Sequence, residues 1–556
     1  MTSDPLSFFT IDHGTASTAA ALIAPYGGRF RLLASSAGPR GLSTETLLED
    51  LVDRVRAAEP DALPDADEWP SWARLEVATD PPPRVIVAAP TEAIADDLVR
   101  TFRATGWEIA ARFVGGRVDP MAITRACLDR DVSVVVLGAP EPANATIRPI
   151  LARLAAAIGA AAHRRDGLHA ILSGGAAAHS EAFPPARVMA APAPDRGHDA
   201  GDHSLETLAA ASTTRWSPAR GRPLPDGRRG FAVAATSLAS LLDRPIDALD
   251  IGHSAGTRVQ ATPDGRRDVH IDAEAALIPR KAMAADSDID AILRWTALRS
   301  EHFGMRDRLR NLRLAPWREA SDDAARLRLA ALRSSLSTLV GHPAPIVRTG
   351  HIAPSTHAAD AGRSGHAGHR GHPIGGDLVV CAGGVFASIP PPVAALAILD
   401  AIRQPGALSI LWDHARVLAP IGTLHAEADR RRLLTELLDD VLVPLGSAIV
   451  VADVHTGRNS PKLRVTSSVG TIETTLEPGH IRTMDLPPGV TGLVELDSRD
   501  VLWVGVRGRH LVMEVAGGLG GLLVDTREVP SRLPERAERR RALLESWEHP
   551  LWPVPA

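Results

Sequence analysis

The same short pattern opens two distant parts of the chain: an apolar run ends on aspartate, glycine follows two residues later, and a second apolar run comes after small and hydroxyl residues. It occurs in FFTIDHGTASTAAALIA, residues 8–24, and in DALDIGHSAGTRVQAT, residues 247–262. Two apolar runs joined by a short polar segment with glycine predict a β-hairpin. Because the pattern starts twice, it also predicts two related halves, as an internal duplication would produce.

Each turn carries groups that serve either structure or chemistry. In the first turn, Asp12 and Gly14 are followed by Thr15, Ser17 and Thr18. A hairpin turn alone explains a glycine, which tolerates positive φ, and hydroxyls that bond their own backbone. A carboxylate, backbone N–H groups and hydroxyls are also the groups that a magnesium–phosphate unit requires. Taken by itself, the first turn favours the structural interpretation.

A third segment adds weight to the chemical interpretation. The run DLVVCAGG, residues 377–384, ends on Gly383 and Gly384, and a glycine pair lets the backbone approach a flat purine closely. Two acidic hairpins that face each other could hold a divalent cation through water, with Asp12 and Asp250 as the carboxylates. None of the three features is specific alone, but their order indicates a nucleotide site.

At 556 residues the chain is too long for one hydrophobic core, so we expect about two to four domains. After the first hairpin, strand-like and helix-like segments alternate, which predicts a mixed sheet with helices on its faces. From residue 447, short strands follow one another with little helix, as in an all-β appendage. We therefore expect an α/β protein in three parts: residues 1–240, residues 241–446, and a β-rich C-terminal domain and tail, residues 447–556. Trp547 and Trp552 of the tail are interpreted as an anchor onto the body.

These segments resemble the actin, sugar-kinase and heat-shock-chaperone ATPase superfamily and, within it, the MutL/GlmL (glutamate mutase L) family. The resemblance rests on TIDHGTAST, LDIGHSAGTRV, DLVVCAGGVFASIPPPVAALAILDAI and LVPLGSAIVVADV. It implies two RNase H-like lobes with ATP and Mg between them. It also implies an ATP-dependent reactivase or chaperone that accompanies a cobalamin-dependent mutase and is not itself the mutase.

The resemblance assigns residues as well. The nucleotide-binding positions that it implies are Asp12, Gly14, Thr15, Ser17, Thr18, Asp250, Gly252, Ser254, Gly383 and Gly384, with Asp12 and Asp250 also holding Mg through water. Three departures remove phosphate contacts on which phosphoryl transfer depends. Ala19 stands where the family often has lysine, Ala255 and Gly256 stand where it usually has a threonine pair, and GAPEPANA, residues 138–145, replaces Gly-Gly-Thr-Asp. No catalytic residue is identified.

Two interpretations of the function therefore stay open. The chain is either an ATPase-type reactivase, with weak ATPase activity, or a catalytically degenerate scaffold that keeps the fold and binds a partner protein without significant ATP turnover. A metabolic kinase or a hydantoinase-like enzyme is a third class, for which the sequence offers no convincing substrate pocket.

Net charge and cysteine content limit the kinds of binding partner and the cellular compartment that we expect. A net charge of −5 gives no basic surface for nucleic acid or membrane, and neither a signal peptide nor a bilayer-spanning run is evident. The cysteines, Cys127 and Cys381, are far apart and are expected to be buried thiols of a cytoplasmic protein. The His/Gly-rich segment 351–376 is interpreted as a disordered insertion rather than a metal site, because no second shell would orient its imidazoles.

Overall fold

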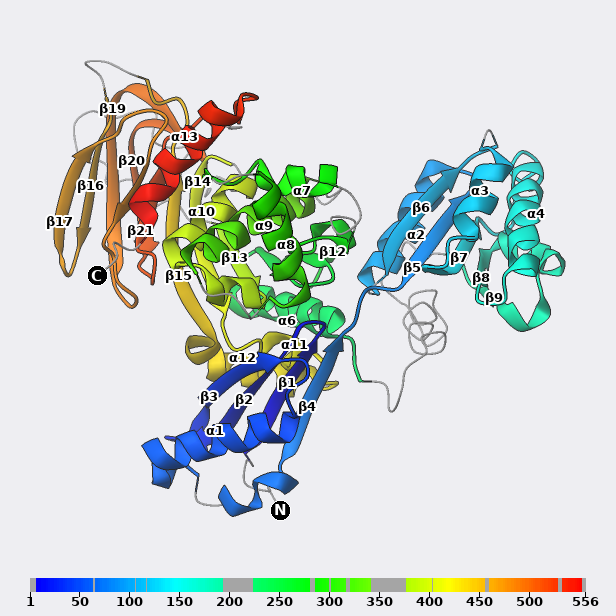
Figure 1. Cartoon of the computed structure of the whole chain (residues 1–556), viewed down its shortest axis with the longest axis horizontal. Helices are drawn as coiled ribbons and strands as arrows, with labels where there is room; N and C mark the ends of the chain where they lie inside the picture. The colour runs from blue at the N-terminus through cyan, green and yellow to red at the C-terminus, as the bar shows by residue number, and fades with distance from the viewer. Residues whose placement is uncertain are drawn as a thin grey trace, which may run out of the picture.

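The computed structural model describes residues 7–63, 66–105, 107–116, 118–193, 224–280, 286–299, 302–316, 321–341, 377–402, 404–455, 460–528 and 533–552. Within them the chain forms a mixed α/β fold with four β-sheets, of four, eight, four and five strands. In Figure 1, three of the sheets and their helices form one body, and the five-stranded sheet lies to one side of it.

The N-terminal hairpin builds the first sheet, in which the strand order is β3-β2-β1-β4. Its strands are β1 (Phe8–Gly14), β2 (Ser17–Tyr26), β3 (Arg29–Pro39) and β4 (Ala73–Thr79). β1 is antiparallel to β2 and parallel to β4. Side chains alternate between the two faces: Phe9 and Ile11 pack with α1 (Thr44–Ala58), whereas Phe8 packs on the opposite face. Two short 3-10 turns follow α1, at Pro60–Ala62 and Ala66–Ser71.

The second hairpin starts a larger sheet with the same opening topology. Its eight strands run in the order β12-β11-β10-β13-β14-β15-β21-β18. They are β10 (Ile246–Ile251), β11 (Gly256–Ala261), β12 (Arg267–Asp272), β13 (Asp377–Ala382), β14 (Gly406–Asp413), β15 (Leu442–Val450), β18 (Ile481–Met484) and β21 (Leu522–Asp525). β10 is antiparallel to β11 and parallel to β13, as β1 is to β2 and β4. The restart of the sequence pattern thus corresponds to a repeated strand order.

Three helices form a layer between these two sheets: α6 (Gly227–Leu242), α11 (Leu418–Gly422) and α12 (Glu427–Val441). Their buried side chains share one hydrophobic core with Phe8 of the first sheet and Val259 of the second. The two sheets are therefore joined through a common helical layer.

The other face of the eight-stranded sheet packs against α9 (Asp322–Gly341) and α10 (Pro391–Ile402). Two further helices, α7 (Asp286–Leu293) and α8 (His302–Leu314), form a small core with α9. Residues 294–299, which follow α7, are not helical, so α7 and α8 are separate helices.

The helices α6 and α11 cross with almost no space between their backbones. A Cβ on Gly422 would lie 1.8 Å from the carbonyl oxygen of Gly230, and a Cβ on Gly230 would lie 2.1 Å from that of Ala419. Glycine is required at both positions, because any side chain would push the helices apart in a close-packed interior.

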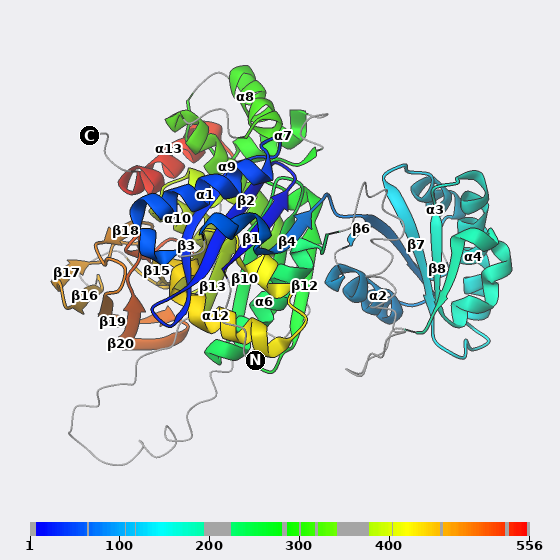
Figure 2. The same ribbon diagram turned by 90° about the horizontal axis from the view of Figure 1, so that it is seen from below.

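Residues 84–191 form a separate, all-parallel sheet in the order β6-β5-β7-β8-β9. Its elements are β5 (Arg84–Ala89), α2 (Glu92–Ala104), β6 (Glu108–Val114), α3 (Pro120–Cys127), β7 (Val132–Ala139), α4 (Arg148–Arg164), β8 (His169–Gly174) and β9 (Val188–Ala191). The expectation of one mixed sheet after the first hairpin is wrong. Strand–helix alternation specifies parallel strands but not which sheet they join. Figures 1 and 2 show this domain beside the body. Its helix α2 contacts β12 of the eight-stranded sheet.

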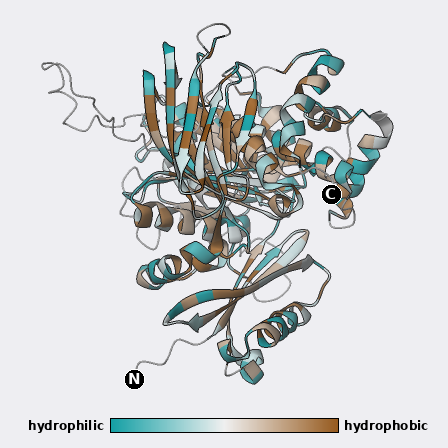
Figure 3. Cartoon of the chain, turned by 90° about the vertical axis from the view of Figure 1, so that its left-hand side faces the viewer, coloured by the Kyte–Doolittle hydropathy of each residue, from teal (hydrophilic) through white to brown (hydrophobic). Residues whose placement is uncertain are grey.

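The C-terminal strands divide between two sheets. β16 (Lys462–Ser467), β17 (Gly470–Thr475), β19 (Thr491–Val504) and β20 (Val506–Ala516) form a four-stranded sheet in the order β17-β16-β19-β20. Figure 3 shows hydrophobic and hydrophilic residues alternating along the strands of this side of the molecule. In contrast, β15, β18 and β21 extend the eight-stranded sheet, so residue 447 lies inside β15. Apolar side chains of both sheets share one core, which joins the C-terminal sheet to the body.

The tail returns to the body through α13 (Ala537–Glu548) and a 3-10 turn at His549–Leu551. Trp547 is buried, donates from Nε1 to the carbonyl oxygen of Gly479 at 3.3 Å, and has the Arg527 guanidinium 4.4 Å from its ring centroid. The ring of Trp552 lies 4.6 Å from the Arg326 guanidinium. The predicted anchoring of both tryptophans is confirmed.

Both cysteines are free and buried, as predicted. Burial raises the pKa of the Cys127 thiol to about 12, so it stays protonated at neutral pH. None of the helices in the described ranges combines the length and the apolar character that crossing a membrane requires.

Candidate functional site

The first hairpin places an aspartate near the carboxyl end of a central strand. β1 ends at Gly14 and β2 begins at Ser17, so the turn contains only Thr15 and Ala16. Asp12 lies two residues before the end of β1, and Thr79 Oγ1 at the end of the parallel neighbour β4 is 3.5 Å from its Oδ1.

The second hairpin repeats this arrangement. Asp250 of β10 lies opposite Thr257 of β11. The N–H of Gly252 donates to the carbonyl oxygen of Ala255 at 3.0 Å, which closes the turn. Ser254, another predicted phosphate contact, lies within that turn.

The structure brings Asp12, Asp250 and Gly383 together. Burial, aided by the nearby charge of Asp12, raises the pKa of Asp250 to about 6. A Cβ on Gly383 would lie 3.2 Å from Asp250 Oδ1 and 2.4 Å from the carbonyl oxygen of Ile251, and Gly383 has φ of +114°. Glycine is therefore required there. Gly384 is exposed, with open space where a side chain would be.

Two arginines that sequence reasoning missed reach these hairpins. Arg416, just after β14, has Nη1 at 3.5 Å from Asp12 Oδ2 and donates to Ser17 Oγ at 3.2 Å. Arg228, in the first turn of α6, is buried and donates to Ser254 Oγ at 3.2 Å. One hydroxyl in each hairpin thus accepts a hydrogen bond from an arginine of a distant segment.

A buried carboxyl group holds the segment that carries Arg416. Asp413, at the end of β14, is 1% exposed and accepts hydrogen bonds from the N–H groups of Val417 at 2.9 Å and Leu418 at 3.0 Å. Burial, with a contribution from the charge of Asp12, raises the pKa of Asp413 to about 7. Asp413 therefore fixes the start of α11 and changes protonation near neutral pH.

The contribution of Asp413 to the free energy of unfolding is expected to fall as pH rises from about 4 to about 7, by up to about 1.4 kcal/mol per pH unit. Its pKa of about 7 in the folded protein lies above the ordinary 3.8, so in this window the folded state retains a proton that the unfolded chain has lost. His253, whose pKa burial lowers to about 4, acts with the opposite sign. The informative quantity is therefore the difference between wild type and Asp413→Asn, which cannot ionise at this position.

Urea unfolding at about pH 5, 6, 7 and 8 measures that difference. The wild type should lose stability relative to Asp413→Asn at each step up to about pH 7. A difference that stays constant with pH would show that the Asp413 pKa is not raised by folding.

The remaining predicted positions are less informative. Thr18 is buried within β2, and Thr15 is partly exposed in the first turn. The segment GAPEPANA, residues 138–145, begins with the last two residues of β7, which belongs to a different sheet from either hairpin. The His/Gly-rich segment 351–376, predicted to be a disordered insertion rather than a metal site, lies outside the described residues.

The charged groups between the hairpins fit a magnesium–polyphosphate better than a bare metal ion. Among the described residues, no group of three or more His, Cys, Asp and Glu side chains is placed to hold a metal. Asp12 and Asp250 would leave most of the coordination to water and phosphate, as is usual for Mg²⁺. Arg416 Nη2 is buried without a hydrogen-bond partner in the described part of the chain, so a donor for an anionic oxygen is present.

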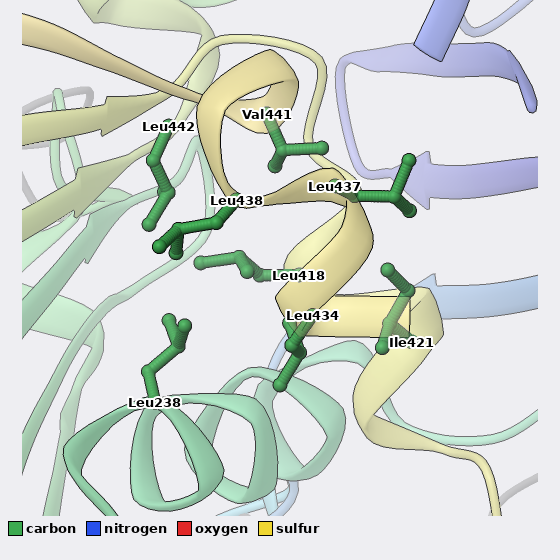
Figure 4. Close-up of a pocket in the computed structure, with 8 residues that line it drawn as sticks. All are labelled: Leu238, Leu418, Ile421, Leu434, Leu437, Leu438, Val441 and Leu442. Atoms are coloured by element: carbon green, nitrogen blue, oxygen red, sulfur yellow. The ribbon is translucent and has the colours of Figure 1, made fainter. Parts of the chain in front are cut away.

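A small pocket lies among α6, α11 and α12, and Figure 4 shows the side chains around it. All are aliphatic: Leu238, Leu418, Ile421, Leu434, Leu437, Leu438, Val441 and Leu442. Such a pocket has no group that could bind phosphate or a metal, so it is part of the packing between helices and not of the candidate site.

Comparisons with known proteins find matches for this chain among solved structures alone. No family model matches it, and no curated protein matches it. Among solved structures, it is similar to component A of (R)-2-hydroxyglutaryl-CoA dehydratase from Acidaminococcus fermentans, with 9% identity, a TM-score of 0.25, and coverage of 77% of this chain and 99% of that one. It is also similar to the type II variant of the Ppx/GppA phosphatase from Aquifex aeolicus, with 10% identity, a TM-score of 0.20, and coverage of 79% and 95%. Likeness at these TM-scores carries no conclusion about function.

Proposed function

We propose that this chain binds Mg-ATP between its two acidic hairpins and uses it to act on a partner protein, as an ATP-dependent reactivase or chaperone. One observation carries the proposal: Arg416, which follows β14 of the second hairpin's sheet, lies 3.5 Å from Asp12 and 3.2 Å from Ser17 of the first hairpin, so the two sheets with the same strand order meet at their acidic hairpins. The two sheets would then be the two RNase H-like lobes that the sequence resemblance implies. That resemblance also supports a cobalamin-dependent mutase as the partner.

In this proposal, each group near the hairpins has a defined part. Asp12 and Asp250 would hold Mg²⁺ through water, and the turn hydroxyls and N–H groups would face phosphate oxygens. Gly383 and Gly384 would lie against the nucleoside. Bound magnesium would neutralise phosphate charge, which is its main contribution to phosphoryl transfer.

A second candidate function is a scaffold that has lost ATP turnover. The contact between Arg416 and Asp12 favours it, because a guanidinium 3.5 Å from a proposed magnesium-side carboxylate competes with the cation. Ala19, Ala255 and Gly256 also favour the scaffold. They stand where the family that the sequence resembles has lysine and threonine, so they remove phosphate contacts. We therefore expect weak nucleotide binding and slow hydrolysis in the absence of a partner.

Mg-ATP is expected to stabilise the wild-type protein, by about 2.7 kcal/mol at 100 times its Kd. Asp12→Ala should abolish this stabilisation while changing the stability of the unliganded protein by less than about 1 kcal/mol, because the ion pair that it breaks is long and partly exposed. Thermal melting with and without Mg-ATP, and with EDTA, measures the effect. Asp50→Ala is the matched control, since Asp50 lies on the exposed surface of α1.

The result separates the two candidates. Binding without turnover, alone or with a partner, would favour the scaffold. Turnover that a partner accelerates would favour the reactivase. If millimolar Mg-ATP leaves the melting temperature of the wild type unchanged, the nucleotide proposal is wrong.

A further inference from the structure

Arg416 adopts a backbone conformation that arginine rarely takes. Its φ is +55°, in the left-handed region, which costs conformational free energy for any residue with a Cβ. The segment is held in place on both sides, by β14 before it and by the hydrogen bonds from Val417 and Leu418 to Asp413 after it. Strained residues that the surrounding structure fixes in this way tend to occur at functional sites.

The guanidinium of Arg416 lies against the turn of the first hairpin. Its Nη1 is 3.2 Å from Ser17 Oγ, 3.5 Å from Asp12 Oδ2, and 3.5 Å from the position that a Cβ on Gly14 would take. The hairpin itself, residues 12–19, contains no lysine or arginine. Arg416 therefore supplies the positive charge at this turn from a segment far away in the sequence.

The hydrogen-bonding capacity of Arg416 is only partly used. A charge-assisted hydrogen bond between guanidinium and carboxylate is usually about 2.7–2.9 Å long, as in the Arg31–Asp440 pair at 2.6 and 2.8 Å. The contact of Arg416 with Asp12 is longer, at 3.5 Å. Its Nη2 is buried and has no hydrogen-bond partner among the described residues. A buried donor without an acceptor is unfavourable, so this N–H group can bind an anionic oxygen without losing another hydrogen bond.

The other arginine at the site does not share this property. Arg228 Nη2 donates to the carbonyl oxygen of Asp80 at 2.6 Å as well as to Ser254. Arg333 also has an Nη2 without a partner in the described chain, but it is fully buried between helices, away from any hairpin. Arg416 alone of these three combines an unused donor with partial exposure, at 14% of its side chain, beside the first turn.

We propose that Arg416 binds a phosphate oxygen of the polyphosphate held at the first hairpin, in place of a lysine within the turn. The inference rests on the proposed nucleotide function, but it concerns the phosphate chain and not the nucleoside. A planar guanidinium with free N–H donors suits a phosphate, which can accept two hydrogen bonds at once.

The test measures binding of Mg-ATP and of Mg-tripolyphosphate by calorimetry. Arg416→Gln and Arg416→Gly should each weaken binding of both probes at least about tenfold, as expected for the loss of a charge-assisted hydrogen bond. Arg416→Lys should recover part of the affinity. Arg432→Gln, on the exposed surface of α12, is the control and should bind like the wild type.

Melting curves show whether the variants fold. Arg416→Gly should melt at or above the temperature of Arg416→Gln, because glycine adopts the left-handed conformation without strain. If Arg416→Gln and Arg416→Gly bind both probes as tightly as the wild type, or more tightly, the proposal for Arg416 is wrong while the nucleotide function stands. If tripolyphosphate binds through Arg416 and ATP does not bind, the phosphate site stands and the nucleotide function falls. If neither probe binds the wild type, both are overturned.

Discussion

Replacing Arg333 by methionine is expected to lower the free energy of unfolding by about 3–5 kcal/mol. Arg333 of α9 is fully buried, and its Nε donates to Asp400 Oδ2 at 2.7 Å while its Nη1 donates to Glu548 of the tail. Arg527 donates to the second oxygen of Asp400 at 2.6 Å. Without Arg333, the buried carboxylates of Asp400 and Glu548 each lose a cationic partner. A buried charge that is not compensated lowers the free energy of unfolding strongly.

Urea unfolding measures this effect, and the tail offers a matched control. Arg299 pairs with Glu545 on the exposed side of α13, at 3.0 Å, so Arg299→Met should cost less than about 1 kcal/mol. The double variant Arg333→Met with Glu548→Gln should be more stable than Arg333→Met alone, because it removes one of the charges left unpaired. A loss below about 1 kcal/mol for Arg333→Met would show that the tail is not held by this buried network.

Gly422→Ala is expected to destabilise the protein by about 3 kcal/mol, the upper end of the usual cost of overpacking. Its Cβ would lie 1.8 Å from the carbonyl oxygen of Gly230 and 2.6 Å from the carbonyl carbon. These are backbone atoms of α6, so no side-chain rotation can relieve the clash and the two helices must separate. Since Arg416 lies just before α11, the variant should weaken Mg-ATP binding as well.

The control for Gly422→Ala is Gly304→Ala in α8, where a Cβ would meet nothing within 4 Å. Alanine should stabilise the protein there, by about 0.5–1 kcal/mol, since it loses less backbone entropy in a helix. Equilibrium unfolding of both variants tests how closely α6 and α11 pack. Equal stability of Gly422→Ala and the wild type would mean that α6 and α11 are not as close in solution.

Local pattern determined the hairpins and most of the strands and helices. The first and second hairpins depend on apolar alternation and on a short polar turn, which involve only neighbouring residues. The first turn does so without a glycine, since Gly14 ends β1 and the turn contains only Thr15 and Ala16. The proximity of Gly383 to Asp250 also depends on a simple rule, because β10 and β13 are parallel neighbours and their carboxyl ends meet at one edge. The predicted nucleotide and magnesium roles of these residues remain predictions.

Sheet membership could not be determined in that way. The strands β5 to β9 form their own sheet, and β15, β18 and β21 join the eight-stranded sheet instead of a C-terminal unit. A strand's sequence indicates how many of its faces are buried, but the partner that covers its edge is selected by packing of the whole chain.

Tertiary structure alone decided which charges meet at the hairpins. Arg416 and Ser17 are 399 positions apart in the sequence. Arg228 lies at the start of α6 and donates a hydrogen bond to Ser254 in the turn of the second hairpin. The composition, in which arginine is the main cation, gives no way to select these two among the rest. The sequence by itself thus determined two acidic hairpins and a glycine pair. Folding decided that arginines lie between those hairpins, because side chains from distant segments become neighbours only when the helical layer packs between the two sheets.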